Sequence, residues 1–175
     1  NVVNFITGTN TKEAHPVIDN MMIKAYRKGA KIVISDPRKI SMGKFAYMQM
    51  QQRPGTDIAL LNSMAHVILK EGLHNEKFIA EHTTGFEEWK KFIEEFTPDV
   101  GEKLTGVPKE AIMKAAITYG SSRKAEIYYK MGINQHTHGK KKVNAKAHLA
   151  ILTGKIGREL NGINPVRETR MVKGV

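Results

Sequence analysis

Four short segments, each directly after an apolar run, contain polar residues that can bind phosphates or nucleosides. They read "TGTNTKEAHP", "SDPRK", "QRPGTD" and "KMGINQHTHG" and begin at Thr7, Ser35, Gln52 and Lys130. Each combines a glycine or proline turn with polar side chains, so backbone amides can approach an anion closely. Asp36 or Asp57 can accept hydrogen bonds from a ribose or a purine edge. Arg38 and Arg53 suit phosphate oxygens. The pattern predicts the binding of a phosphorylated ligand.

Structural roles compete with binding at these residues. Thr56 or Asp57 is equally well explained as the cap of the helix that follows. Asp36 before Pro37 is a common turn former. The Gly-x-Gly-x-x-Gly fingerprint does not follow the first apolar run and the P-loop signature is missing. An ordinary nicotinamide Rossmann site is therefore disfavoured, and a P-loop NTPase is excluded.

Composition narrows the class of protein further. The 175 residues include 28 Lys and Arg against 17 Asp and Glu, a net charge of +11. Such a balance favours anionic partners, although a solvated basic face explains it equally well. The lack of cysteine excludes disulfides and thiolate or iron–sulfur ligation within the chain. His136 and His138 have no acidic or cysteine partner nearby, and we predict no metal site. Without a targeting segment or membrane span, we expect a cytoplasmic protein.

Strands and helices that alternate along the chain must position the polar segments. Apolar runs predict strands over residues 2–7, 30–35, 45–51 and 125–132. Helical periodicity predicts helices over 11–29, 57–72, several between 76 and 120, and one over 140–157, with a loop over 158–175. The first helix is expected to have an apolar face of Val17, Ile18, Met21, Met22 and Ile23.

This order of elements predicts an α/β fold with a doubly wound, mostly parallel, Rossmann-like sheet and a helical insert. We expect a single domain over residues 1–175, with both ends cut from a longer polypeptide. Because parallel strands end at the same edge of a sheet, the four polar segments should converge there.

Nine stretches from about Gly8 to Arg167 carry a family resemblance. They read "GTNTKEAHPV", "GAKIVISDPRK", "RPGTDIALLN", "VILKEGL", "TGFEEW", "LTGV", "YKMGINQHTHG", "LAILTGKIGR" and "GINPVR". In this order and spacing they resemble the molybdopterin oxidoreductase superfamily of the dimethyl sulfoxide reductase type. Within it they are most similar to the catalytic alpha subunit of formate dehydrogenase. The sequence departs from the family pattern at 168–171, "ETRM" in place of "GQNN", and at Lys155, where asparagine is usual.

The resemblance implies a parent enzyme that oxidises formate to carbon dioxide with a bis-molybdopterin guanine dinucleotide cofactor holding molybdenum or tungsten. It implies that this fragment contacts the cofactor through Gly8, Asn10, Glu13, Asp36, Arg38, Gly55, Asp57, Met131, Gly132 and Gln135. Arg167 would be the catalytic residue, beside the metal and the substrate. The metal-ligating residue and the iron–sulfur cluster would lie outside this chain. We therefore expect the fragment alone to be inactive and apo.

Two other functions stay open at this point. The chain resembles other molybdopterin oxidoreductases, such as nitrate reductase, to a lesser degree. Its charge also fits a free-standing nucleotide or nucleic-acid binding module. In the leading interpretation the partners are the remaining domains of the catalytic subunit, electron-transfer subunits and formate, with no nucleic acid and no membrane span.

Overall fold

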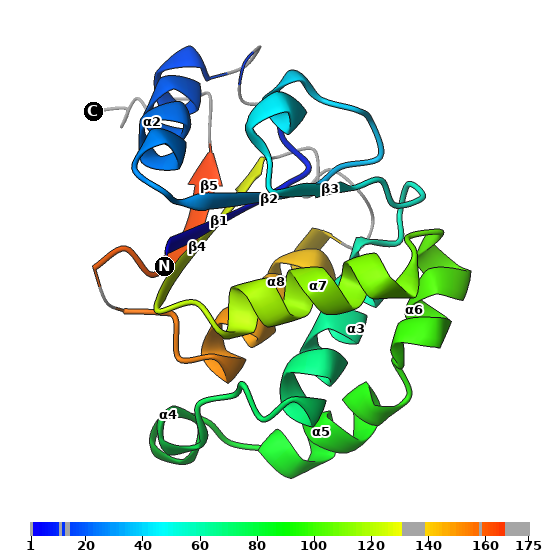
Figure 1. The fold of residues 1–175 in the computed structure, drawn as a ribbon. Coiled ribbons are helices and arrows are strands. Elements are labelled where there is room, and N and C mark those ends of the chain that lie inside the picture. Colours follow the sequence, from blue (N-terminus) through cyan, green and yellow to red (C-terminus); the bar gives the residue numbers. More distant parts are fainter. Residues whose placement is uncertain (1, 11, 13–14, 131–138, 158, 167–175) are drawn as a thin grey trace, which may run out of the picture.

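The computed structural model describes residues 2–10, 12, 15–130, 139–157 and 159–166 as a layered α/β fold. Five parallel strands form one sheet in the order β3-β2-β1-β4-β5 (Figure 1). Their bounds are Val2–Thr7 for β1, Lys31–Ser35 for β2, Met48–Met50 for β3, Lys124–Lys130 for β4 and Gly162–Val166 for β5. The predicted α/β class with a parallel, doubly wound sheet is confirmed.

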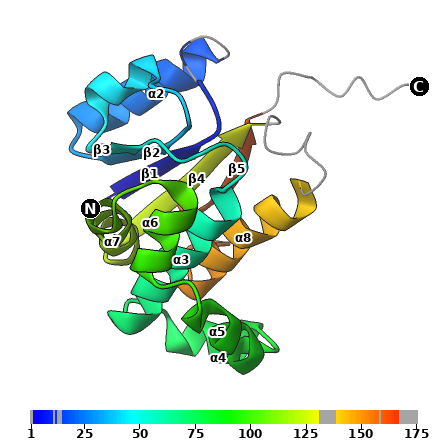
Figure 2. The same ribbon diagram turned by 90° about the vertical axis from the view of Figure 1, so that its right-hand side faces the viewer.

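Helices cover the sheet from both sides. On one side lie α2 (Pro16–Arg27) and the 3-10 helix η1 (Ser41–Phe45). On the other lie α3 (Asp57–Lys70), α7 (Lys109–Gly120) and α8 (Gly139–Leu152), as Figures 1 and 2 show. The helical insert adds α4 (Glu76–His82), α5 (Phe86–Glu94) and α6 (Pro98–Thr105) outside α3. No helix in the described ranges is long and apolar enough to cross a bilayer.

Successive residues of the strands point to opposite faces of the sheet and pack in two separate hydrophobic cores. Phe5, Val33 and Ile127 point to the larger core, where they pack with the buried faces of α3, α7 and α8. Ile6 and Ile34 point the other way, into a smaller core. Both faces of the central strands are thus apolar, which is typical of a parallel sheet buried between helices.

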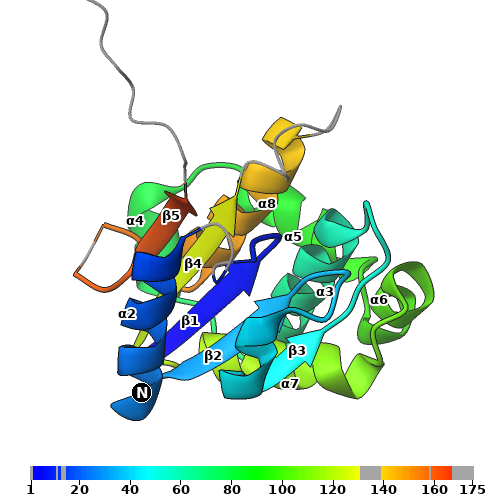
Figure 3. The same cartoon turned by 90° about the horizontal axis from the view of Figure 1, so that it is seen from above.

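The prediction of a loop over residues 158–175 was wrong for its central part. Residues 162–166 form β5, which pairs with β4 in parallel register (Figure 3). The sequence did not predict this strand because it contains Asn164 and Pro165, and both residue types are depleted in strands. Proline is tolerated at a sheet edge, where one side of the strand needs no amide donor. The side chain of Asn161 anchors the strand's start by accepting a hydrogen bond from the Ala125 amide at 3.0 Å.

Two other predictions need correction. The third strand is confined to Met48–Met50, because the preceding residues form η1. The expected apolar face of α2 is buried only in part: Met22 is 3% exposed and Ile18 and Ile23 pack against the smaller core, but Val17 is 68% and Met21 is 63% exposed. A helical apolar stripe shows which residues share a face, but not whether another element covers that face.

The structure gives Lys155 a role. Its side chain is buried, and its ammonium group donates hydrogen bonds to the carbonyls of Tyr119 and, at 2.9 Å, Gly120. These carbonyls belong to the last turn of α7, which has no basic residue of its own there. A cation at this point satisfies terminal carbonyls and opposes the negative end of the helix dipole. Burial lowers the pKa of Lys155 from 10.5 to about 8.

We predict that Lys155 makes stability depend on pH. Between pH 8 and 10.5 Lys155 is neutral in the native protein, whereas in the unfolded chain it still holds its proton. The free energy of unfolding therefore increases as the pH rises through this window. The free energy of unfolding of the wild type minus that of Lys155→Met should rise across this window, by up to about 1.4 kcal/mol per pH unit. Urea denaturation at several pH values measures it, with Lys70→Met as the exposed-lysine control. A constant difference would contradict the prediction.

Candidate functional site

The loops that follow β1, β2 and β3 are fixed side by side at the carboxyl edge of the sheet. The Gly8 amide donates to the Ser35 carbonyl at 3.1 Å, just past the end of β1. The Asp36 amide donates to the Met50 carbonyl, also at 3.1 Å, just past the end of β2. These bonds extend the sheet ladder by one step, so the polar residues that come next start from a rigid frame. The chain order reverses between β1 and β4, and ligands of such sheets gather at that reversal.

Asp36 forms a tight turn that directs Arg38 outward. The Asp36 side chain is 3% exposed, and its Oδ1 accepts a hydrogen bond from the Arg38 amide at 2.9 Å. The Gln49 side chain holds the Arg38 carbonyl at 2.8 Å, so the arginine backbone is fixed from both sides. The Arg38 side chain is 69% exposed, and its Nε lies 3.5 Å from Asp36 Oδ1. A fixed backbone and an exposed guanidinium, whose Nε alone reaches Asp36, suit the binding of an incoming phosphate.

The Pro54–Gly55 corner is a turn that only glycine fits well. The Thr56 amide donates to the Arg53 carbonyl at 3.2 Å, with proline and then glycine between them. Gly55 has φ of 85°, which matches the third position of a type II turn. Thr56 does not cap the helix with its side chain, because its hydroxyl donates to the Arg53 carbonyl at 2.7 Å. Thr56 thus occupies the N-cap position of α3 as considered, but it caps the helix through its carbonyl, which accepts from the Leu60 amide at 3.1 Å, and not through its side chain.

Asp57 begins α3 and is held by a buried glutamine. Gln52 is 2% exposed and Asp57 is 8% exposed. The Gln52 side-chain amide donates to Asp57 Oδ1 at 3.1 Å. This bond orients the carboxylate at the helix N-terminus, where the dipole favours a negative charge.

Arg53, a predicted phosphate ligand, has a structural role in the described structure. Its Nη1 donates to the Lys103 carbonyl at 3.1 Å, and its amide donates to the Thr105 carbonyl at 2.8 Å. Gly106, which follows α6, lies against the arginine side chain. Arg53 therefore ties the corner to the end of α6.

Several buried polar atoms at the same edge have no hydrogen-bond partner among the described residues. They are Thr9 Oγ1, Asn10 Oδ1, Ser41 Oγ and Gln52 Oε1; other such atoms, for example Ser63 Oγ on α3, lie elsewhere in the fold. Leaving such an atom unsatisfied costs about 1–3 kcal/mol, so a native protein normally supplies a partner. Beside them lies an open hollow of about 680 Å³ lined by Asn10, Lys39, Ile40, Ser41, Gly43, Lys44, Gln49 and Gln51. Exposed lysines and unsatisfied buried acceptors are what a polar, anionic ligand requires.

Six of the eleven predicted site residues fall within the described structure, and all six lie at this edge or in its loops. They are Gly8, Asn10, Asp36, Arg38, Gly55 and Asp57. Glu13, Met131, Gly132, Gln135 and Arg167 lie outside the described residues. The sequence analysis did not single out Thr9 or Gln52. Both directly follow an apolar strand, and that position is the one signal by which they could have been found.

No cluster of potential metal ligands occurs among the residues that the structure describes, and His136 and His138 are outside them. The buried histidine in the described part, His66, contacts the Ile93 carbonyl through Nδ1 at 3.1 Å. It thus has a structural role in joining α3 to α5.

The fold is a doubly wound α/β domain whose polar, glycine-containing loops meet at the carboxyl edge of the sheet. The molybdopterin oxidoreductase family model matches residues 3–174. The chain therefore belongs to the molybdopterin oxidoreductase family.

Relatives agree with this assignment. The chain is 44% identical over 169 residues to the F420-dependent formate dehydrogenase subunit alpha of Methanocaldococcus jannaschii, covering 97% of this chain and 25% of that protein. It is 40% identical over 163 residues to a nitrate reductase of Symbiobacterium thermophilum, covering 87% of this chain and 22% of that protein. Acetylene hydratase from Pelobacter acetylenicus has a similar structure, with a TM-score of 0.85 at 25% identity over 90% of this chain and 22% of the hydratase. The chain spans about a quarter of the length of the curated relatives it matches.

We predict that Gly55→Ala destabilises the protein by about 1–2 kcal/mol, the cost of a side chain in left-handed backbone. A Cβ at this position would meet no atom within 4 Å, so the loss comes from backbone conformation rather than a clash. Urea denaturation measures the change. Gly162→Ala is the matched control because its φ is not positive and its nearest neighbouring atom is 4.0 Å away. Equal stability of the two variants would contradict the prediction.

Proposed function

We propose that this chain is one domain of the catalytic subunit of a molybdenum- or tungsten-dependent formate dehydrogenase. The domain spans residues 1–175 and binds the guanosine and diphosphate part of a bis-molybdopterin guanine dinucleotide. The iron–sulfur cluster and the metal ligand would belong to other parts of the subunit. The similarity to a formate dehydrogenase alpha subunit over 97% of the chain supports the reaction.

One observation carries the cofactor assignment: the buried, unpartnered oxygens of Thr9, Asn10 and Gln52 at the carboxyl edge. Their chemistry fits a nucleotide, whose ribose hydroxyls and guanine N–H groups can donate to them. Lys39 and Lys44 line the same hollow as Asn10 and supply positive charge there, as a diphosphate requires. A generic basic surface for nucleic acid has no need of buried, unpaired acceptors, because it works through exposed cations.

Each residue of the edge has a task in this proposal. Gly8 allows the backbone to approach the diphosphate, and the guanidinium of Arg38 pairs with phosphate oxygens. The carboxylates of Asp36 and Asp57 accept hydrogen bonds from the guanosine. Glu13, Met131, Gly132 and Gln135 extend the contact along the ribose, diphosphate and pterin. When bound, the cofactor supplies the two-electron redox chemistry, and the chain's residues bind and orient it.

Arg167 has the catalytic task. Its guanidinium stays cationic at any physiological pH and can pair with both oxygens of formate, which fixes the substrate's orientation. When the C–H bond breaks, the carboxylate loses its negative charge and neutral carbon dioxide remains, so the guanidinium would act by holding formate in position rather than by stabilising charge on the product.

The cofactor assignment is tested in the full-length subunit with Asp36→Ala. Loss of hydrogen bonds to a charged group costs about 1.5–3 kcal/mol, so guanine dinucleotide binding should weaken about 10–100-fold. Acid hydrolysis of the purified subunit should release less guanosine monophosphate per polypeptide than the wild type. Glu71→Ala removes an exposed carboxylate at the other end of α3 and should leave the release unchanged. Full release from the Asp36 variant would refute this role.

The reaction is tested by assaying the same subunit with formate and a dye acceptor, and with nitrate and a reduced dye. We predict formate oxidation, with kcat/KM about 10–100-fold lower in Arg167→Lys because lysine cannot pair bidentately with a carboxylate. Arg27→Lys, an exposed change on α2, is the control. Turnover of nitrate without formate oxidation would favour the nitrate reductase alternative, which the relative of that name supports.

A further inference from the structure

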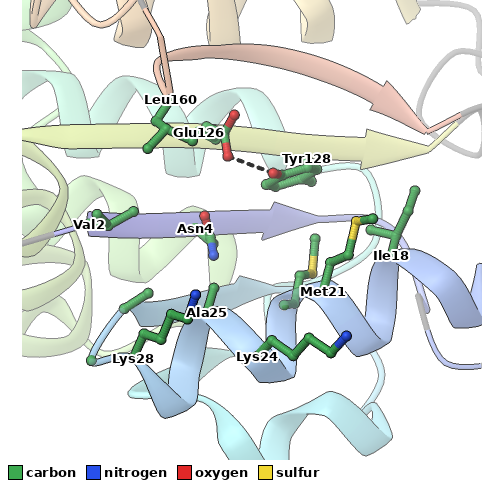
Figure 4. Close-up of a pocket in the computed structure, with 13 residues that line it drawn as sticks. Val2, Asn4, Ile18, Met21, Lys24, Ala25, Lys28, Glu126, Tyr128 and Leu160 are labelled. Atoms are coloured by element: carbon green, nitrogen blue, oxygen red, sulfur yellow. Dashed lines mark hydrogen bonds between the residues drawn. The ribbon is translucent and has the colours of Figure 1, made fainter.

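A second hollow lies away from the carboxyl-edge loops, beside α2 and over β1 and β4. Its volume is about 780 Å³. Figure 4 shows Met21 and Ile18 reaching from α2 toward Tyr128 on β4, with Asn4 on the neighbouring strand β1. None of the six described site residues lines it.

The hollow marks the half of this sheet face that the described elements leave uncovered. On the opposite face α3, α7 and α8 pack against the sheet, and on this face α2 packs against β2 and η1. The flank of α2 that faces β4 remains open, and the hollow there is lined by Met21 and Leu160, which are 63% and 46% exposed. Parallel sheets are normally covered by helices on both faces, and a contiguous apolar patch of this kind marks an interaction surface.

The floor of the hollow contains a carboxylate, that of Glu126, to which two side chains donate hydrogen bonds. The Tyr128 hydroxyl donates to Glu126 at 2.6 Å, and the Asn164 amide donates to the other Glu126 oxygen at 3.4 Å. Glu126 is the one acidic residue among the described residues that line the hollow. Its carboxylate has lone pairs to spare, so it favours a cationic donor from outside. Burial, and then the bond to Glu126, raise the pKa of Tyr128, so this hydroxyl keeps its proton.

Chain topology limits where the missing cover can come from. Right-handed crossovers put α8 on the α3 face as the chain passes from β4 to β5, and another such unit beyond β5 would add a helix to the same face. A cover for the α2 face must therefore come from a separate part of the polypeptide. The chain spans only about a quarter of its relatives' length, so a longer subunit has ample chain to supply it.

We propose that this hollow is the docking surface for a helix from the part of the parent subunit that lies outside this chain. Apolar side chains of that helix fill the space between Met21 and Leu160. An arginine or lysine of the helix faces Glu126, and acidic residues lie beside Lys24 and Lys28 at the rim. This inference rests on the proposed function, because it takes the chain to be one domain of a longer catalytic subunit.

The test uses cysteine variants of the full-length subunit, Met21→Cys and Leu160→Cys, alkylated with N-ethylmaleimide and followed at the peptide level by mass spectrometry. The same variants are made in the 175-residue chain. Both cysteines should react at least about tenfold more slowly in the full-length subunit, because the docked helix must open first. Rates in urea for each protein correct for intrinsic reactivity.

Glu87→Cys, on the exposed side of α5, is the control and should react similarly in both proteins. Equal rates at Met21→Cys in the two proteins would overturn the proposal. Equal protection of the α5 control would do the same, since it would mean general shielding. In another outcome, the labelling rate of the 175-residue chain falls as its concentration is raised, and a dimer mass appears. That result would identify a second copy of the chain as the occupant and would also overturn the proposal.

Reversing the rim charges gives an independent readout. Lys24→Glu combined with Lys28→Glu should raise the labelling rate at Met21→Cys in the full-length subunit toward that of the 175-residue chain carrying the same two changes. Because both lysines lie at the carboxyl end of α2, where the helix dipole favours cations, the pair should also lower the melting temperature of the short chain slightly, and that loss is measured separately. An unchanged rate would contradict the charge complementarity in the proposal.

The labelling test can fail or succeed independently of the proposed function. A subunit that neither oxidises formate nor holds a guanine nucleotide, but whose cysteines are protected, would refute the proposed function and support the docking surface. A subunit that oxidises formate but whose cysteines are unprotected would support the function and refute the docking surface.

Discussion

The candidate site depends on the parallel alignment of the strands, which is extended by backbone hydrogen bonds beyond their ends. The bonds from Gly8 to Ser35 and from Asp36 to Met50 align three loops that are separated by many residues in the sequence. Neither bond uses a side chain, so the start of each loop is set by the backbone of the sheet. Thr9, Asp36 and Gln52 are buried in this frame even though each belongs to a loop. A loop held this firmly can keep polar atoms in readiness for a ligand.

The same edge divides its residues between structural and binding tasks. Asp36 shapes a turn and Arg53 joins two elements, while the side chain of Arg38 is exposed and contacts Asp36 through Nε. Gln52 does both: its amide orients Asp57, and its oxygen remains unpaired among the described residues. Two arginines at similar distances past a strand thus have different roles. Only the direction of each side chain, which sequence spacing does not encode, distinguishes them.

Much of the fold was predictable because its strands are apolar runs and its helices have clear punctuation. The strand at Val2–Thr7 and the helix beginning at Asp57 follow directly from these patterns. β5 was missed because Asn164 and Pro165 are poor strand formers, and the strand exists through its pairing with β4. The exposure of Met21 was unpredictable for a related reason: a stripe of apolar residues does not reveal whether a partner covers it. In the site, residue types pointed to the loops, but the unpaired oxygens of Thr9 and Gln52 depend on tertiary burial.

The bonds from Arg53 to the end of α6 make the helical insert a brace for the Pro54–Gly55 corner. The corner and α6 are 50 residues apart at the Arg53–Lys103 contact, so they move together although they are remote in the sequence. Fraying of α6 would release the corner, and a ligand that immobilises the corner would in turn slow the exchange of amide hydrogens in the last turn of α6. An insertion that looks peripheral in the sheet topology is thus a mechanical support for the ligand edge.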